Sequence, residues 1–212
     1  NALQDQGSVD GAAKQLDLAL SYKPEKSGWL IRKALFLPVI PYSQEDIVNR
    51  REGLCETVRA LQDKNLTVEN PIVDIGSTNF YLAYHAKNNR SIMQSIAKLY
   101  ISACPELTFE AEHCRSIPAR KSGRLKIGFL SSYFREHSVG KLSRGFIEHF
   151  SRDLFEVIVF LLPGKKDAVT EAIVQSADKC ILLNKNLKKD RVSIAKQELD
   201  CLLYLDIGMD PY

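Results

Sequence analysis

The residues best suited to chemistry lie at positions 125–140, LKIGFLSSYFREHSVG. A short apolar run ends at Ser131 and Ser132, and one histidine, His137, follows in the same polar turn. In an open α/β sheet the ligand crevice lies outside the carboxyl ends of the strands, so a histidine just past a first strand is well placed for substrate contact or proton transfer. The alternative from the residues alone is that His137 caps the next helix or packs at the rim.

The elements that must position this histidine alternate between strands and helices. The run FEVIVFLL at 155–162 is typical of a strand that is buried on both faces. We predict three further strands at 125–130, 180–183 and 201–205. The intervening helices are predicted at 141–150, 168–177 and 190–199. This alternation predicts a parallel, doubly wound, Rossmann-like sheet. The chain has neither a GxGxxG after the first strand nor a GxxxxGK[ST], which disfavours the dinucleotide-binding and P-loop classes.

The first two dozen residues predict part of a tetratricopeptide repeat. Small and large residues recur at the spacing of the second half of such a repeat, namely Gly7, Ala12, Leu16 and Ala19. Pro24 then stops the second helix of the repeat. A plain helical hairpin is the alternative. A single incomplete repeat cannot bury its apolar face alone, so we expect further repeats before it.

Residues 26–113 continue with helical patterns. Ser43 followed by Asp46 is a helix-start signal, and a later helix is expected at 92–104 with an apolar stripe. His85 and His113 lie in or beside these helices, where a lone histidine is more often a packed residue than a ligand. We therefore expect a helical part at 1–114, a basic linker at 115–124, and the Rossmann-like lobe at 125–212. The basic linker is interpreted as a solvated connector rather than a phosphate-binding stripe, since no aromatic residue is interleaved.

Composition excludes several function classes. The formal net charge of +3 is too small to argue for nucleic acid, and no apolar run reaches the roughly 20 residues that cross a bilayer. The five cysteines form no CxxC and no zinc-site spacing with histidine, so we expect reduced core thiols, no metal and a cytoplasmic protein.

Four blocks of the sequence resemble the O-linked N-acetylglucosamine (O-GlcNAc) transferase family, particularly its bacterial, tetratricopeptide-containing members. They are IGSTNFYLAYH at 75–85, the segment LKIGFLSSYFREHSVG, FEVIVF at 155–160, and YLDIGMDPY at 204–212. The resemblance implies a tetratricopeptide superhelix joined to the first of two Rossmann-like lobes of a GT-B type glycosyltransferase. It also implies that the second lobe, which binds most of the UDP-sugar, lies outside this chain.

The chemistry that this resemblance implies is inverting transfer of a sugar from UDP-N-acetylglucosamine to a Ser or Thr hydroxyl, without a cofactor. His137 matches the family's rim histidine, for which we favour substrate positioning over base catalysis. Ser138, Val139 and Gly140 are the implied substrate-binding residues. The family commonly has aspartate where this chain has Tyr133, and that replacement is expected to alter the rim.

Two functions from different classes remain open at this stage. The first is a fragment of a glycosyltransferase that carries the acceptor-side lobe, is inactive alone, and has an acceptor protein or peptide as its partner. The second is a non-catalytic tetratricopeptide scaffold that binds proteins. Asp206 and Asp210, after the last expected strand, are interpreted as turn residues, and the alternative is that they act at the edge of the crevice. Four strands are fewer than usual, so we also expect an unpaired sheet edge and self-association through it.

Overall fold

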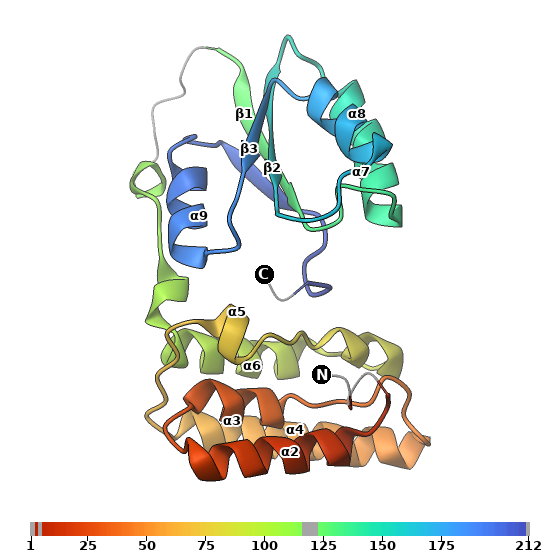
Figure 1. The fold of residues 1–212 in the computed structure, drawn as a ribbon, viewed down its shortest axis with the longest axis vertical. Helices are drawn as coiled ribbons and strands as arrows, with labels where there is room; N and C mark the ends of the chain where they lie inside the picture. The colour runs from red at the N-terminus through yellow and green to blue at the C-terminus, as the bar shows by residue number, and fades with distance from the viewer. Residues whose placement is uncertain (1–2, 4–5, 116–122, 211–212) are drawn as a thin grey trace. The chain divides into compact units, whose positions relative to one another are not determined.

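The computed structural model describes residues 3, 6–115 and 123–210. The chain divides into two compact units, residues 1–109 and residues 110–210, which are drawn in Figure 1. Most of the expected linker, residues 116–122, lies outside the described residues. The expected domain boundaries therefore stay a prediction.

The first unit is built from helices. Its elements are α2 (Val9–Tyr22), α3 (Ser27–Ala34), α4 (Gln44–Gln62), α5 (Pro71–Asp74), η1 (Phe80–His85), α6 (Arg90–Ala103) and η2 (Pro105–Thr108). Helices α4 and α6 pack against each other, and their buried side chains share one apolar core with Ile31 of α3. This core includes Leu54 and Val58 from α4 and Leu99 from α6.

Local sequence signals explain several of these helices. The Ser43 side chain accepts a hydrogen bond from the Asp46 N–H at 3.1 Å, which confirms the predicted start of α4. The apolar stripe of α6 is also confirmed, since Ile92, Ile96 and Leu99 are all buried. Residues 80–85 form a 3₁₀-helix, and the left-handed conformation of Ala86 ends it. The tetratricopeptide arrangement of the N-terminal helices stays a prediction.

The second unit contains a four-stranded sheet whose strands are all parallel. After the short η3 (Glu112–Cys114), its elements are β1 (Leu125–Ser131), α7 (Ser138–His149), β2 (Phe155–Leu161), α8 (Ala168–Ser176), β3 (Lys179–Leu182), α9 (Leu187–Ala195) and β4 (Cys201–Tyr204). The strand order is β3-β2-β1-β4, with Ile127 of β1 paired with Val157 on one side and Cys201 on the other. The predicted alternation and the parallel sheet are confirmed.

Helices cover both faces of this sheet, with α7 and α8 together on one face and α9 on the other (Figure 1). On the first face Ile147 of α7 and Ile173 of α8 pack against Phe129 and Val159. The other face buries Ile158 and Phe160 beside Ile194 of α9. Burial on both sides explains why β2 is a continuous apolar run rather than an alternating one.

Two helices begin earlier than the sequence predicted, and in both cases a capping side chain is the reason. Helix α7 begins at Ser138 because His137 caps it, and α9 begins at Leu187 because the Asn186 side chain accepts from the Lys189 N–H at 3.0 Å. No helix among the described residues is both long and apolar enough to cross a membrane.

Candidate functional site

The candidate site lies where β1, β2 and β3 end. A pocket of about 180 Å³ is lined by residues that follow these three strands and by Asp210 after β4. We call residues 132–137, which join β1 to α7, the rim turn. This is the edge of a parallel sheet at which ligands bind in open α/β folds.

His137 is held at the start of α7 by its own ring. Its Nδ1 accepts a hydrogen bond from the Val139 N–H at 3.2 Å, and the side chain is half-buried. An accepting Nδ1 carries no proton, so the neutral ring carries its proton on Nε2. The capping role that the sequence left as an alternative is therefore present, and it leaves an Nε2–H donor in a fixed ring.

Tyr133 supports the histidine from one side. The two rings are stacked with centroids 4.3 Å apart and planes 24° from parallel. The Arg135 guanidinium carbon lies 5.5 Å from the centroid of the same Tyr133 ring. Burial, followed by the negative charges of Asp210 and Asp206, raises the pKa of the Tyr133 hydroxyl. The aromatic residue at this position thus links His137 to the wall of the pocket.

The three residues predicted to bind substrate differ in what the fold does with them. Ser138 is exposed, Val139 is half-buried and donates its N–H to His137, and Gly140 is buried. A Cβ on Gly140 would lie 2.1 Å from the Arg135 carbonyl oxygen and 2.6 Å from that of Tyr133. Gly140 therefore allows the rim turn to cross the first turn of α7. Their proposed role in substrate binding stays a prediction.

Asp167 joins the rim turn to helix α8. One carboxylate oxygen accepts from the Glu136 N–H at 2.7 Å, and the other accepts from the N–H groups of Val169 and Thr170 at the start of α8. The Thr170 hydroxyl donates to the Phe134 carbonyl oxygen at 2.7 Å. The Glu136 N–H bond in particular lowers the pKa of Asp167. The carboxylate is thus a fixed anchor for the turn that carries His137.

Asp206 anchors the same turn from β4. Its side chain is 8% exposed and accepts a hydrogen bond from the Ser132 N–H at 3.0 Å. Burial raises the pKa of this carboxyl group, and the nearby charge of Asp210 acts in the same direction. Asp206 does lie in the turn after β4, as predicted, but the structure adds a contact to Ser132 of the rim turn that no local pattern encodes.

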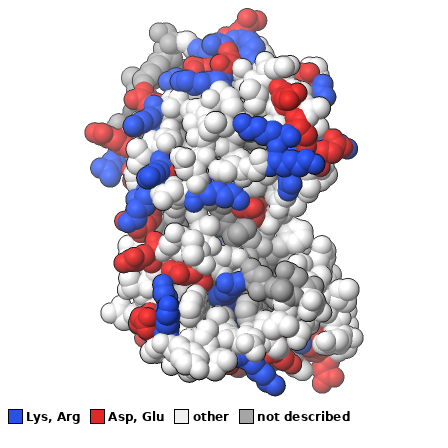
Figure 2. Space-filling view, in the orientation of Figure 1, with Lys and Arg blue, Asp and Glu red and all other residues white. Residues whose placement is uncertain are grey.

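Sequence reasoning missed the basic side chains of the pocket. Arg135 in the rim turn, Lys165 and Lys166 after β2, and Lys185 after β3 all line it, whereas Asp210 is the one acidic residue in the described lining. We call this set the basic pocket. The signal that could have found it is the sequence PGKK directly after a buried strand, since turns after parallel strands meet at one edge. Figure 2 shows that basic and acidic side chains are interspersed on the viewed face.

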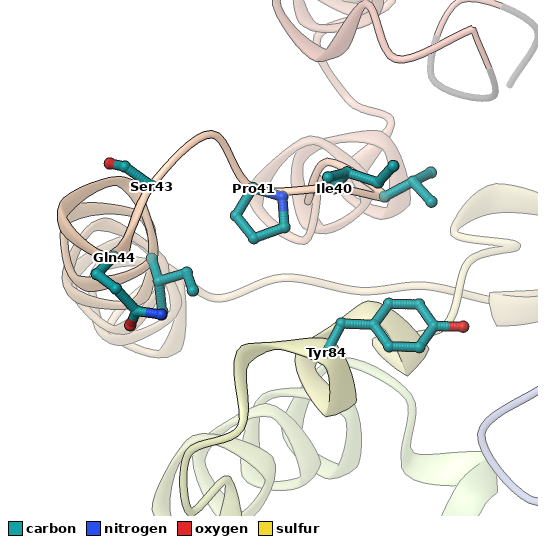
Figure 3. Close-up of a pocket in the computed structure, with 7 residues that line it drawn as sticks. Ile40, Pro41, Ser43, Gln44 and Tyr84 are labelled. Atoms are coloured by element: carbon teal, nitrogen blue, oxygen red, sulfur yellow. The ribbon is translucent and has the colours of Figure 1, made fainter.

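The helical unit has a separate, apolar hollow of about 690 Å³. Figure 3 shows that its lining comes from the segment before α4, from the first turn of α4 and from η1, which contribute Ile40, Gln44 and Tyr84 among others. Ile40 and the neighbouring Tyr42 are 77% and 82% exposed. The lining is mostly apolar, and it contains no charged side chain or histidine among the described residues.

The two other histidines singled out from the sequence are packed residues. His85 is 2% exposed, and neither ring nitrogen has a hydrogen-bond partner among the described residues. The Nε2 atom of His113 lies 3.3 Å from the Leu199 carbonyl oxygen. The part of the chain that the structure describes contains no group of three or more His, Cys, Asp or Glu side chains that could hold a metal ion.

Comparison with known proteins shows that this chain resembles one of them in fold. No protein-family model matches the sequence, and no curated protein matches it either. Among solved structures, a mutant of the O-GlcNAc transferase of Thermobaculum terrenum matches with a TM-score of 0.59 at 18% sequence identity. The match covers 98% of this chain and 38% of that one, so this chain spans well under half of its structural neighbour. The likeness shows a glycosyltransferase-like fold, in which the parallel sheet corresponds to a Rossmann-like lobe.

Proposed function

We propose that this chain forms the acceptor-side part of an inverting glycosyltransferase of GT-B type, which transfers N-acetylglucosamine from a UDP-sugar to Ser or Thr hydroxyls of proteins. The observation that carries the proposal is the ring of His137, which the cap bond at Nδ1 and the stacking of Tyr133 fix just past the carboxyl end of β1, with the proton of the neutral ring on Nε2. The likeness in fold to an O-GlcNAc transferase supports the same class of reaction.

In the proposed reaction the acceptor oxygen forms a bond to the anomeric carbon of the sugar. The bond from that carbon to the diphosphate oxygen breaks, its electron pair leaves with UDP, and the hydroxyl proton passes to a base or to solvent. Because Nε2 of His137 already carries a proton, this ring is suited to donate a hydrogen bond to the acceptor oxygen and to orient it. Acting as the base would require a doubly protonated ring and would break the cap bond to Val139.

Other residues of the lobe support the positioning role of His137 because they hold the rim turn and the imidazole ring in place. Asp167 and Asp206 hold the rim turn at Glu136 and Ser132, and Tyr133 holds the imidazole by stacking. A positioning group is effective only when its own geometry is fixed by such contacts. The binding energy for the UDP-sugar is assigned to a second lobe outside this chain. We also propose a cytoplasmic location, with all five cysteines free; the expectation of core thiols holds for Cys104, whereas Cys114 and Cys201 are exposed.

The test is a transfer assay on the complete protein to which this chain is proposed to belong. Radiolabelled UDP-N-acetylglucosamine is supplied with Ser- and Thr-containing peptides, and the anomeric configuration of the product is read by NMR. Labelled peptide with inverted configuration is the expected result. Hydrolysis without transfer to peptide, or retention of configuration, would rule the proposal out.

A non-catalytic protein-binding module is the second candidate, and the apolar hollow beside Ile40 and Tyr42 favours it. The two candidates differ in which substitution matters. If the protein is only a binding module, Tyr42→Ser and Ile40→Ser weaken the capture of its partner, and the complete protein transfers no sugar to any peptide.

A further inference from the structure

We propose that the basic pocket is a subsite for one anionic group, a carboxylate or a phosphate, carried by the acceptor protein close to the Ser or Thr that receives the sugar. This inference rests on the proposed function and names the acceptor class: acidic or phosphorylated segments. The shared chemistry of the ligand is a planar or tetrahedral oxyanion.

Charge is the first argument. The lining holds Arg135, Lys165, Lys166 and Lys185 against the single acid Asp210. Within the described part of the chain no salt bridge joins any of the four basic side chains to an acid. Four like charges around a pocket of about 180 Å³ repel one another, and an oxyanion between them relieves that repulsion.

Arg135 supplies the second argument. Its Nε atom is buried and has no hydrogen-bond partner among the described residues. A buried N–H without an acceptor is unfavourable, and native structures rarely leave one unpaired. The Tyr133 ring, 5.5 Å from the guanidinium carbon, restrains the group. A planar guanidinium with an unused N–H is the side chain that binds carboxylates and phosphates best.

The turn that presents Lys185 is also held in advance. Lys185 has φ of 56°, a left-handed conformation that is unfavourable for a residue with a side chain. The buried Asp190 carboxylate holds this conformation because it accepts from the N–H groups of Asn184 and Asn186, on either side of Lys185. The lysine backbone is therefore placed at the pocket before a ligand arrives, which lowers the entropy lost on binding.

The helix end beside the pocket does not supply the positive field. Asp167 already accepts the N–H groups of Val169 and Thr170 at the start of α8, and its negative charge offsets the dipole there. Recognition of the anion is thus assigned to the four side chains.

Proximity to His137 assigns the anion to the acceptor. Tyr133 contacts both groups, with its ring centroid 4.3 Å from that of His137 and 5.5 Å from the Arg135 guanidinium carbon. The guanidinium thus lies no more than about 10 Å from the imidazole, and an extended chain advances about 3.4 Å per residue. An acidic or phosphorylated residue within about three positions of the acceptor hydroxyl reaches the pocket.

The first experiment measures binding directly and needs no transfer activity. The 212-residue chain, labelled with ¹⁵N, is titrated with inorganic phosphate at low ionic strength, and shifts of the Arg135 and Lys185 amides are followed. We expect millimolar binding that weakens about tenfold in Arg135→Gln and in the double variant Lys165→Gln/Lys166→Gln. Lys189 on α9 and Lys196 at its C-cap are exposed and lie outside the pocket lining. Lys189→Gln therefore matches the charge change of Arg135→Gln, the control Lys189→Gln/Lys196→Gln matches that of the lysine double variant, and both keep wild-type affinity.

The side chains of Lys165 and Lys166 are exposed, so their substitution is expected to leave the fold intact. The lysine double variant therefore tests the site even if Arg135→Gln unfolds the rim turn. Phosphate binding that is absent, or equally strong in the lysine double variant and in the control, overturns the subsite. This result is independent of sugar transfer, so it fails or succeeds separately from the proposed function.

The second experiment identifies the source of the anion. A Ser peptide with Glu three residues away, its Gln counterpart and UDP each compete with phosphate for the pocket. We expect the Glu peptide to displace phosphate and the Gln peptide not to. UDP that binds tenfold or more tightly than phosphate would instead assign the pocket to the donor, and equal behaviour of the two peptides would also overturn the acceptor assignment.

Discussion

Our proposal gives the His137 ring two purposes: Nδ1 caps helix α7, and Nε2–H donates a hydrogen bond to the acceptor oxygen. The two purposes can be separated by substitution. His137→Asn keeps a cap acceptor, because asparagine is among the best N-cap residues, whereas His137→Ala removes both groups. We expect both variants of the complete protein to lower kcat for transfer by about 10²-fold or more.

Thermal unfolding of the same two variants provides the control. His137→Ala is expected to lose about 1 kcal/mol of stability with the cap, and His137→Asn only a small part of that. Transfer that survives in His137→Asn while His137→Ala loses both stability and activity would make the histidine a structural cap alone.

His85 makes the stability of the chain depend on pH. Burial, reinforced by the positive charges of Arg51 and Arg50, lowers the pKa of its imidazole below the ordinary 6.5. The unfolded chain therefore binds a proton at a higher pH than the folded chain does. As pH falls below about 6.5 the free energy of unfolding decreases, and the decrease ends once the pH passes below the folded-state pKa.

Urea unfolding at pH 8 and pH 5 tests this effect with His85→Leu. At pH 8 both states of the wild type are neutral at this site, and the variant is expected to be at least as stable because it removes two unpaired ring nitrogens. At pH 5 the variant should be more stable than the wild type by a larger margin. An identical margin at the two pH values would contradict a depressed pKa.

At the residue scale, sequence alone located the histidine but not its surroundings. An apolar run followed by a polar turn is a local pattern, so the rim position of His137 could be predicted. The stacking of Tyr133 on His137 and the bond from Asp206 to Ser132 depend on the path of the turn and on the pairing of β1 with β4. The basic pocket combines turns some 50 residues apart in the chain, from Arg135 to Lys185, and only the strand order brings them together.

Helix α7 contains two glycines that should respond in opposite ways to the same substitution. A Cβ on Gly140 would lie within 3 Å of backbone atoms of Tyr133 and Arg135, whereas a Cβ on Gly145 meets nothing within 4 Å. We expect Gly140→Ala to cost about 1–3 kcal/mol because the rim turn must move. Gly145→Ala is expected to add about 0.5–1 kcal/mol through helix propensity.

Denaturant unfolding measures both effects, and the difference between the two variants is the informative quantity. A tolerated Gly140→Ala would mean that the rim turn is looser than the described contacts require, and the fixed orientation of His137 would then lose its support. The boundaries of the helices and strands also depend on contacts of single side chains. Strand positions followed from apolar runs, whereas the true start of α7 depended on a histidine cap that standard N-cap preferences do not include.

The sheet as a whole ends in strands that pair on one side only. Among the described residues β4 pairs with β1 alone, and Tyr204 at its end is 52% exposed. Unpaired strand edges promote association between copies, so we expect self-association of the isolated chain at high concentration. Tyr204→Lys should reduce it, and Tyr22→Lys, at a still more exposed tyrosine on α2, should not. Light scattering that shows a strict monomer would count against an open edge.

Affinity for the donor tests whether this chain is half of a cleft. The fold accounts for 38% of the matching transferase, and the described pocket of about 180 Å³ is too small to enclose a nucleotide sugar. We therefore assign the binding energy for uridine and sugar to groups outside the chain, and among the described residues we expect the basic pocket to bind a phosphate of the donor no more tightly than free phosphate. We expect calorimetric titration of the isolated chain with UDP-N-acetylglucosamine to give millimolar affinity at best, further weakened in Arg135→Gln. Micromolar binding by the chain alone would refute the assignment of donor binding to a second lobe.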